Sequence, residues 1–190
     1  MFNNNHKLNL HKVLKLSYDN NNNHQQKMKK RLSIWFYAIK KNEKVYYNPT
    51  DNKLLVSVAG TDKFSPKEII TDAYLAAGKL QNTTRYQHAH NTIIDAKKKY
   101  NVSSATLAGH SLGGSIVSYA GSKNDKIYTL DKGATIGTKT RSREKAFRSA
   151  GDIVSALSAN SSNMKTKGKY NFNPLSAHNV SNIKHDKIYI

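Results

Sequence analysis

Cysteine is absent from this 190-residue sequence, and long apolar runs and acidic residues are scarce. The absence of cysteine excludes a disulfide framework, a thiolate metal site and a cysteine nucleophile. The longest apolar run, residues 34–39, is far shorter than the ~18 residues that span a bilayer. Residues 1–16 interrupt every apolar pair with Asn, His or Lys, which argues against a secretory signal. These absences favour a soluble protein that is cytoplasmic or associated with a larger particle.

The shortage of acidic residues leaves the chain strongly basic, with 31 Lys and Arg against 12 Asp and Glu and a formal charge of +19. Such a balance suits nucleic acid or an anionic membrane surface as a partner. The cluster at 27–31 (KMKKR) supports the first choice, but the other lysines are scattered and no recognition module is present. The asparagine runs at 3–5 and 20–23 indicate a general drift toward Lys and Asn. We therefore expect no specific nucleic acid, and keep a basic nucleic-acid-binding or particle-associated structural protein as the alternative.

The length predicts one compact domain, preceded by an extension. Residues 1–32 are polar, basic and rich in asparagine, with a weak helical stripe of leucine and valine that predicts two short helices. From residue 33 the chain becomes aromatic and apolar. We therefore expect an N-terminal helical extension at 1–32 and a compact domain at 33–190.

Strands and helices alternate through this domain. The predicted elements are a β-hairpin with its turn at 48–52 and a buried strand at 54–59, helices at 65–80, 84–100 and 115–120, strands at 105–108 and 126–130, and a strand-like segment at 187–190. Alternation of this kind predicts an α/β fold. Its central sheet should be mostly parallel, with an antiparallel β-hairpin leading into it and helices on its flanks.

The most informative segment is LAGHSLGGSI at 107–116, which holds the pattern G-x-S-x-G between a predicted strand and a predicted helix. This context is typical of a nucleophile elbow, a tight turn that projects a serine hydroxyl above a sheet. Gly109 and Gly113 would let the strand and the helix pass closely. Ser111 would be the nucleophile, and the backbone N–H of Leu112 would face a developing oxyanion.

Two other interpretations of nearby residues fail. The glycines at 109–114 have the spacing of a phosphate-binding loop, but Ser115 stands where that loop needs a lysine. His88 and His90 are not a metal pair, because residues two apart on a helix point to different faces. A plain Gly-Ser loop without catalytic use is the remaining alternative.

A serine nucleophile needs a histidine base and an acid, which follow it along the chain in this fold class. The histidines after Ser111 are His178 and His185, and a loop position favours His178. Asp131 and Asp152 are the candidate acids, since both sit at strand-end positions. Other acidic residues in this stretch, which we consider less suitable, are Asp125 and Glu144.

At these residues the sequence resembles the class 3 lipases, a branch of the α/β-hydrolase fold. The likeness covers roughly residues 45–183 and rests on Gly60-Thr61 after an apolar strand, GHSLGG at 109–114, GDIV at 151–154 and His178. It implies that Asp152 rather than Asp131 is the acid. It also implies that Thr61 is the second contributor to the oxyanion hole, beside Leu112.

Within that family the stretches KGATIG and NPLSAHNVSNI are most similar to small lipase-like proteins of large DNA viruses and related mobile elements. The sequence departs from the family pattern in three ways. Ala59 replaces the usual arginine before Gly60, the segment 62–70 would be a short polar lid without tryptophan, and the spacings are compact. A small lid implies an open site, which favours a shorter ester or a phospholipid over triglyceride.

The sequence as a whole predicts a serine hydrolase of carboxylic esters: a lipase, phospholipase or esterase. Neither a metal nor an organic cofactor is needed for this chemistry. The expected partners are a lipid or small ester substrate and an anionic membrane surface, which attracts each nearby lysine or arginine with about 1 kcal/mol. A degenerate lipase fold kept as a structural protein is a further alternative.

Overall fold

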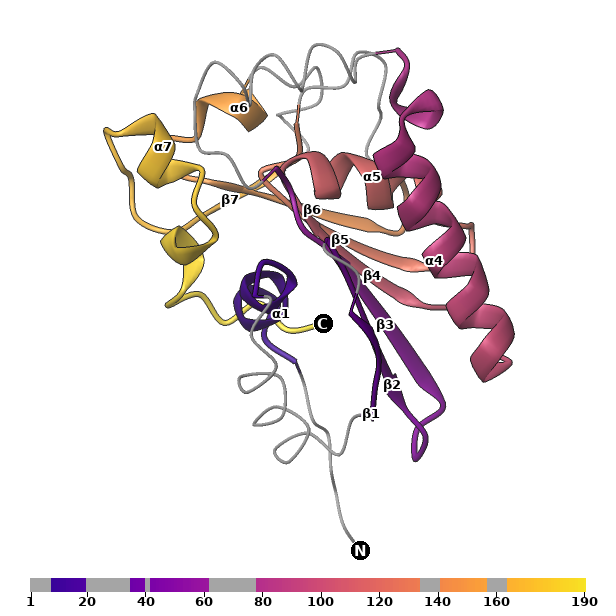
Figure 1. Cartoon of the computed structure of the whole chain (residues 1–190). Coiled ribbons are helices and arrows are strands. Elements are labelled where there is room, and N and C mark those ends of the chain that lie inside the picture. The colour runs from indigo at the N-terminus through magenta and orange to yellow at the C-terminus, as the bar shows by residue number, and fades with distance from the viewer. Residues whose placement is uncertain (1–7, 20–34, 40–41, 62–77, 134–140, 157–163) are drawn as a thin grey trace, which may run out of the picture.

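The computed structural model describes residues 8–19, 35–39, 42–61, 78–133, 141–156 and 164–190. These residues form a seven-stranded sheet in the order β1 to β7 (Figure 1). The strands are β1 Trp35–Ile39, β2 Glu43–Asn48, β3 Lys53–Val58, β4 Thr106–His110, β5 Lys126–Leu130, β6 Glu144–Ser149 and β7 Lys165–Lys167. The first three pair antiparallel and the remaining pairs are parallel. The predicted α/β fold with a mostly parallel sheet and a hairpin leading into it is confirmed.

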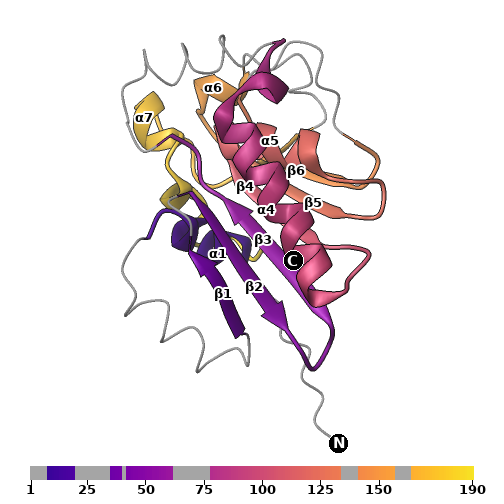
Figure 2. The ribbon, with the colours of Figure 1, turned by 45° about the vertical axis from the view of Figure 1, so that its right-hand side comes forward.

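Helices cover both faces of the sheet (Figures 1 and 2). One face carries α4 Thr84–Tyr100 and α5 Leu112–Ala120, and the other carries α1 Leu10–Ser17. Short helices follow the later strands or connect elements: η1 Leu80–Asn82, α6 Ile153–Ala156, α7 Pro174–Ala177 and η3 Val180–Ile183. None of the helices in the described ranges is long and apolar enough to cross a bilayer.

The two ends of helix α4 are determined by residues within or next to the helix. The Thr83 side chain accepts a hydrogen bond from the amide of Tyr86 and caps the helix start. Asn101 ends the helix in the left-handed conformation, with φ 51°. Three lysines in the last turn complement the helix dipole. The predicted helix at 84–100 is confirmed.

A cluster of buried apolar side chains lies between α1 and the sheet, on the face opposite α4. Leu10, Val13 and Leu14 are buried there with residues of the sheet and of the C-terminal segment. The amide of Leu10 donates to the carbonyl of Ile188 at 2.8 Å. Residues 8–19 of the predicted extension therefore pack on the sheet, while the boundary at residue 32 stays a prediction.

Several predicted elements differ from those observed. The elbow strand is at 106–110 instead of 105–108, and the helix after it begins at Leu112 instead of 115. The predicted strand at 187–190 is wrong, since Tyr189 makes only an isolated bridge to Asn9. Strands β6 and β7 were not predicted, because lysine and arginine interrupt their apolar pattern. The predicted helix at 65–80 lies mostly outside the described residues, as does the second N-terminal helix.

Candidate active site

Ser111 occupies the turn between β4 and α5, in a conformation that few L-residues adopt. Its φ is 55° and its ψ is −126°. The surrounding backbone holds it there, because its amide donates to the carbonyl of Leu130 at 3.0 Å. Its own carbonyl accepts from the amides of Ser115 at 3.2 Å and Gly133 at 3.3 Å. Strained residues of this kind persist where neighbouring structure fixes them, and they concentrate at functional sites.

The glycines around Ser111 are required by close backbone contacts. A Cβ atom on Gly109 would lie 2.3 Å from the carbonyl oxygen of Gly113. A Cβ atom on Gly113 would lie 2.3 Å from the carbonyl oxygen of Val58. These separations are far below any van der Waals contact, so only glycine lets α5 pass this close to β3 and β4. The two glycines singled out in the sequence thus have a steric role at the turn.

His178 and Asp152 lie beside Ser111, although they come from distant parts of the chain. The imidazole Nδ1 of His178 is 2.9 Å from Oδ1 of Asp152, and its Nε2 is 2.8 Å from Oγ of Ser111. A carboxylate only accepts, so Nδ1 carries the proton and Nε2 accepts from the Ser111 hydroxyl. All three side chains are buried. The structure therefore brings together the three residues that the sequence analysis selected, in hydrogen-bond reach of one another.

The charges at this site favour an imidazolium on His178. Burial alone would lower the pKa of His178, but the hydrogen bond to Asp152 and the negative charges of Asp152 and Asp131 outweigh it and raise that pKa above 6.5. Burial acts to raise the pKa of Asp152, and its hydrogen bond and attraction to His178 lower it below the usual value. The pair can thus hold a proton taken from Ser111.

The predicted oxyanion contributors are the neighbours of residues in contact at the turn. Leu112 begins α5, so its amide belongs to the first turn, where amides have no acceptor within the helix. A Cβ atom on Gly60 would lie only 2.8 Å from Cβ of Ser111. Thr61 follows this contact directly. The Arg85 guanidinium donates to the carbonyl of Ala59 at 2.7 Å and so holds the segment that leads to Thr61.

Arg85 and Tyr18 are residues of this region that the sequence analysis missed. The phenol oxygen of Tyr18 lies 2.6 Å from Nδ1 of His110 and 2.7 Å from the amide nitrogen of Gly60. Nε2 of His110 lies 2.8 Å from the carbonyl oxygen of His178, which can only accept, so this nitrogen carries the proton. Burial lowers the pKa of His110, in keeping with a neutral ring. Tyr18 therefore donates to His110 and accepts from Gly60, linking α1 to both sides of the site.

The other acid and base candidates have different partners. Asp131 accepts from the Ser149 amide at 2.5 Å and hydroxyl at 2.7 Å, and burial raises its pKa. Asp125 accepts from the Ala105 amide and pairs with Lys97. Glu144 is bonded to the buried ammonium of Lys132 at 2.8 Å. His185 is exposed. Each of these carboxylates has a structural hydrogen-bond role, away from the Ser111 hydroxyl.

His110, Asp131 and His178 offer nitrogen and oxygen atoms that lie within 4.8 Å of one another. A metal ion could in principle use such a set. Nε2 of His110 already donates to the carbonyl of His178, and Asp131 is bonded to Ser149. The nitrogens of His178 face Asp152 and Ser111. A cation would have to displace these bonds, so this donor set fits a hydrogen-bonded network better than a metal.

Comparison with known proteins gives matches among solved structures alone. No protein-family model matches the sequence, and no curated protein matches it. A triacylglyceride lipase of Rhizomucor miehei matches 68% of this chain and 62% of its own, with 15% identity and a TM-score of 0.45. A propeptide complex of the native lipase of that organism matches 64% of this chain and 49% of its own, with 16% identity and a TM-score of 0.35. The chain thus spans less than two thirds of these proteins, and the likeness is one of fold.

Proposed function

We propose that this protein is a serine hydrolase of carboxylic esters, of the class 3 lipase kind. The observation that carries the proposal is the hydrogen-bonded series Ser111, His178 and Asp152, with separations of 2.8 and 2.9 Å, on a serine held at positive φ. A hydroxyl, an imidazole and a carboxylate in this order are the arrangement that activates a serine nucleophile. The likeness to small viral lipase-like proteins remains a prediction of the sequence.

In the proposed reaction Ser111 attacks the acyl carbon of the ester while Nε2 of His178 takes its proton. Asp152 holds the proton on Nδ1 and stabilises the imidazolium. The amides of Thr61 and Leu112 donate to the oxyanion of the tetrahedral intermediate. His178 then gives its proton to the leaving alkoxide, and an acyl-serine remains. Water, deprotonated by Nε2 of His178, attacks this ester, and His178 returns the proton to Oγ of Ser111 as the acid is released.

The proposed substrates are lipid or small carboxylic esters. The reaction as written uses side chains, backbone amides and water, so no metal or organic cofactor takes part in it. A net charge of +19 favours esters that lie in an anionic surface, such as phospholipids.

The test is ester hydrolysis by a Ser111→Ala variant. With p-nitrophenyl butyrate, turnover should fall about 10⁴-fold or more, because the variant lacks the nucleophile. A fluorophosphonate should label wild-type protein at Ser111, as located by peptide mass spectrometry. Ser115→Ala is the matched control, since among the described residues its hydroxyl donates to the carbonyl of Gly133. Turnover by Ser111→Ala at the wild-type rate would refute the proposal.

A further inference from the structure

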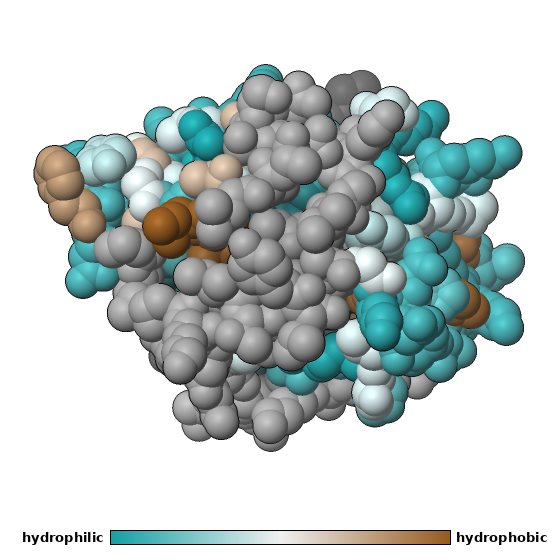
Figure 3. Space-filling model, turned by 90° about the horizontal axis from the view of Figure 1, so that it is seen from above, coloured by the Kyte–Doolittle hydropathy of each residue, from teal (hydrophilic) through white to brown (hydrophobic). Residues whose placement is uncertain are grey.

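Exposed apolar side chains gather on one part of the surface beside the candidate active site. Within the described ranges, the large apolar residues with strong exposure are Phe172 at 91%, Tyr170 at 66%, Tyr189 at 46% and Ile153 at 45%. All but Tyr189 line a single hollow. Seen from above, brown and tan surface lies toward the left of the molecule beside teal, and smaller brown areas lie at the right (Figure 3). A phenylalanine this exposed stabilises no core, and a group of such residues marks an interaction site.

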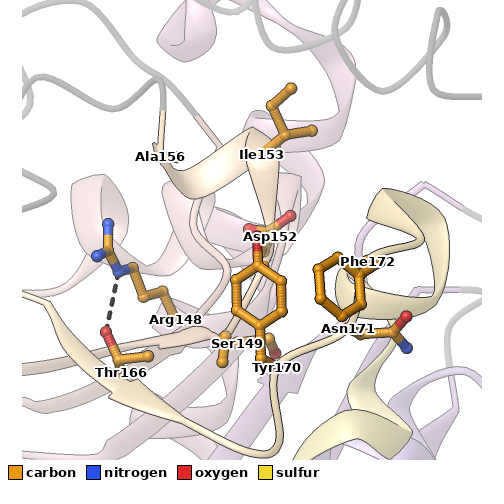
Figure 4. Close-up of a pocket in the computed structure, with 11 residues that line it drawn as sticks. Arg148, Ser149, Asp152, Ile153, Ala156, Thr166, Tyr170, Asn171 and Phe172 are labelled. Carbon is orange, nitrogen blue, oxygen red and sulfur yellow. Dashed lines mark hydrogen bonds between the residues drawn. The ribbon is translucent and has the colours of Figure 1, made fainter.

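The hollow between these side chains has a volume of about 520 Å³. It lies between α6 and the segment that connects β7 to α7 (Figure 4). The rings of Tyr170 and Phe172 meet edge to face with their centres 4.9 Å apart, and Ile153 stands over them (Figure 4). We call Ile153, Tyr170 and Phe172 the aromatic face.

Backbone contacts hold the two segments of the aromatic face together. The amide of Ala150 donates to the carbonyl of Lys167 at 2.8 Å, and the amide of Asn171 donates to the carbonyl of Ala150 at 3.3 Å. Gly151 has φ 89°, and a Cβ atom there would lie 2.3 Å from the carbonyl oxygen of Asn171. The exposed rings therefore stand on a preformed support, which reduces the ordering cost of binding.

Cationic residues lie on the segments that carry the aromatic face. Arg148 lines the hollow, and its Nε donates to Oγ1 of Thr166 at 3.1 Å (Figure 4). Lys165 lies on β7 and Lys169 directly precedes Tyr170, and both are exposed. Asp152 is the one carboxylate among the residues that line the hollow, and it is buried against His178. These segments thus carry more positive than negative charge.

We propose that the aromatic face docks on a bilayer that contains anionic phospholipid. Amphipathic rings settle at the level of the lipid headgroups, and lysines beside them attract the negative surface. The exposed rings, the cationic residues near them and the overall charge of +19 together favour an anionic bilayer as the partner. This inference rests on the proposed function, because docking serves an enzyme that hydrolyses esters in a membrane. Ile153 follows Asp152, and Phe172 lies shortly before His178, so docking would bring the hydrolytic site to esters in the membrane.

The experiment is vesicle sedimentation with the full chain carrying Ser111→Ala, so that no lipid is consumed. We expect binding to phosphatidylcholine vesicles that contain phosphatidylglycerol, and weaker binding to pure phosphatidylcholine. Adding Tyr170→Ser and Phe172→Ser should weaken binding to the anionic vesicles about tenfold or more. Adding Lys165→Gln and Lys169→Gln should weaken it about fivefold for each lysine, and more salt should remove this difference.

Matched controls separate this face from general charge and apolarity. Tyr189→Ser removes a less exposed ring that does not line the hollow, and Lys98→Gln with Lys123→Gln removes two exposed lysines remote from the face. Both controls should bind within about twofold of the parent protein. The proposal is overturned if the parent binds neither vesicle, if the serine double variant binds as the parent does, or if a control loses as much affinity. Self-association that the double variant abolishes would identify a second copy as the occupant and also overturn it.

Hydrolysis of a soluble ester distinguishes failure of this proposal from failure of the proposed function. With Ser111 restored, the Tyr170→Ser and Phe172→Ser variant should hydrolyse p-nitrophenyl butyrate at the wild-type rate, since both rings are exposed and the proposed reaction runs through Ser111, His178 and Asp152. If wild-type protein lacks this activity but binds vesicles through the aromatic face, the proposed function fails and the docking surface stands. If wild-type protein has this activity but does not bind vesicles through the aromatic face, the docking proposal fails and the proposed function stands.

Discussion

The two sides of the candidate active site are built in contrasting ways. Ser111 lies on one continuous stretch, β4, turn and α5, whose geometry depends on backbone contacts made by Gly109 and Gly113. Asp152 and His178 lie on separate connections, after β6 and before η3. Side-chain hydrogen bonds hold them, such as those that Asp152 accepts from the amides of Val154 at 3.2 Å and Ser155 at 2.9 Å. Close backbone packing and backbone hydrogen bonds therefore shape one side, and side-chain hydrogen bonds shape the other.

This contrast implies that the two sides fail differently. A substitution at the glycines forces backbone segments apart and should reduce stability. A substitution at Asp152 that keeps its shape leaves the backbone in place and should change the chemistry.

The largest effect should come from Asp152→Asn. An asparagine fits the same space but cannot stabilise the imidazolium, and its amide favours the wrong tautomer of His178. Turnover of p-nitrophenyl butyrate should fall about 10⁴-fold, while the thermal unfolding followed by circular dichroism remains cooperative. A variant that retains more than a tenth of wild-type turnover would contradict the proposed role of Asp152.

The same variant should alter the pH profile. A base acts when neutral, and the pKa of His178 is raised above 6.5, so wild-type kcat/KM should rise with pH through a midpoint above 6.5. In Asp152→Asn the largest raising influence is gone and burial remains, so the midpoint should move to lower pH. The rate of fluorophosphonate labelling against pH measures this shift. An unchanged midpoint would show that Asp152 does not set the charge of His178.

The next effect should come from Gly113→Ala, which tests the glycine side. Its added carbon would lie 2.3 Å from the carbonyl of Val58, so α5 and β3 must separate. The free energy of unfolding should fall by about 3 kcal/mol or more, as measured with urea. Gly114→Ala is the matched control, because its nearest contact is 3.3 Å and alanine favours a helix. Equal losses in the two variants would remove the steric explanation.

The smallest effect should come from Tyr18→Phe, which joins the two sides through His110. Without the hydroxyl, Nδ1 of His110 and the amide of Gly60 lose a partner, which should cost about 1–3 kcal/mol of stability. We expect kcat to fall about tenfold with KM little changed, because the carbonyl of His178 and the segment before Thr61 are less firmly placed.

The matched control for Tyr18 is Tyr47→Phe. Its hydroxyl donates to Asn52 at the hairpin, remote from Ser111. This variant should keep wild-type kcat. If Tyr18→Phe loses stability but keeps kcat, Tyr18 is a structural residue with no positioning role.

The parts of the fold that were predictable are those whose signals are local. Helix α4 carries its cap, its dipole lysines and its apolar stripe within a single stretch. The elbow likewise needs only a short pattern between a strand and a helix. Strand β6 was missed because Lys145 and Arg148 interrupt it, and its place follows from pairing with β5 instead. The segment 187–190 has the pattern of a strand, yet Asn9 offers it only one bridge.

The residues of the candidate site likewise divide into those that local sequence predicts and those that it does not. Spacing and residue type select Ser111, but the choice between Asp131 and Asp152 depends on a family resemblance, since both follow strands. Distance to His178 separates them, and distance is not contained in a single sequence. Tyr18 escapes notice because nothing near it along the chain shows that it meets His110. In the sequence Arg85 cannot be told from the other basic residues of α4, although its guanidinium donates to the carbonyl of Ala59.

The pairing of residues 8–10 with 188–190 has a consequence for the order of assembly during translation. The amide of Leu10 donates to the carbonyl of Ile188 and the amide of Ile190 donates to the carbonyl of Leu8, so the C-terminal segment is one of the partners that hold α1 against the sheet. The backbone groups that bond to Ser111 come from residues up to 133. During translation these groups therefore leave the ribosome before Asp152, His178 and the C-terminal partner of α1, so the proposed hydrolase would gain its nucleophile first and its acid and base last.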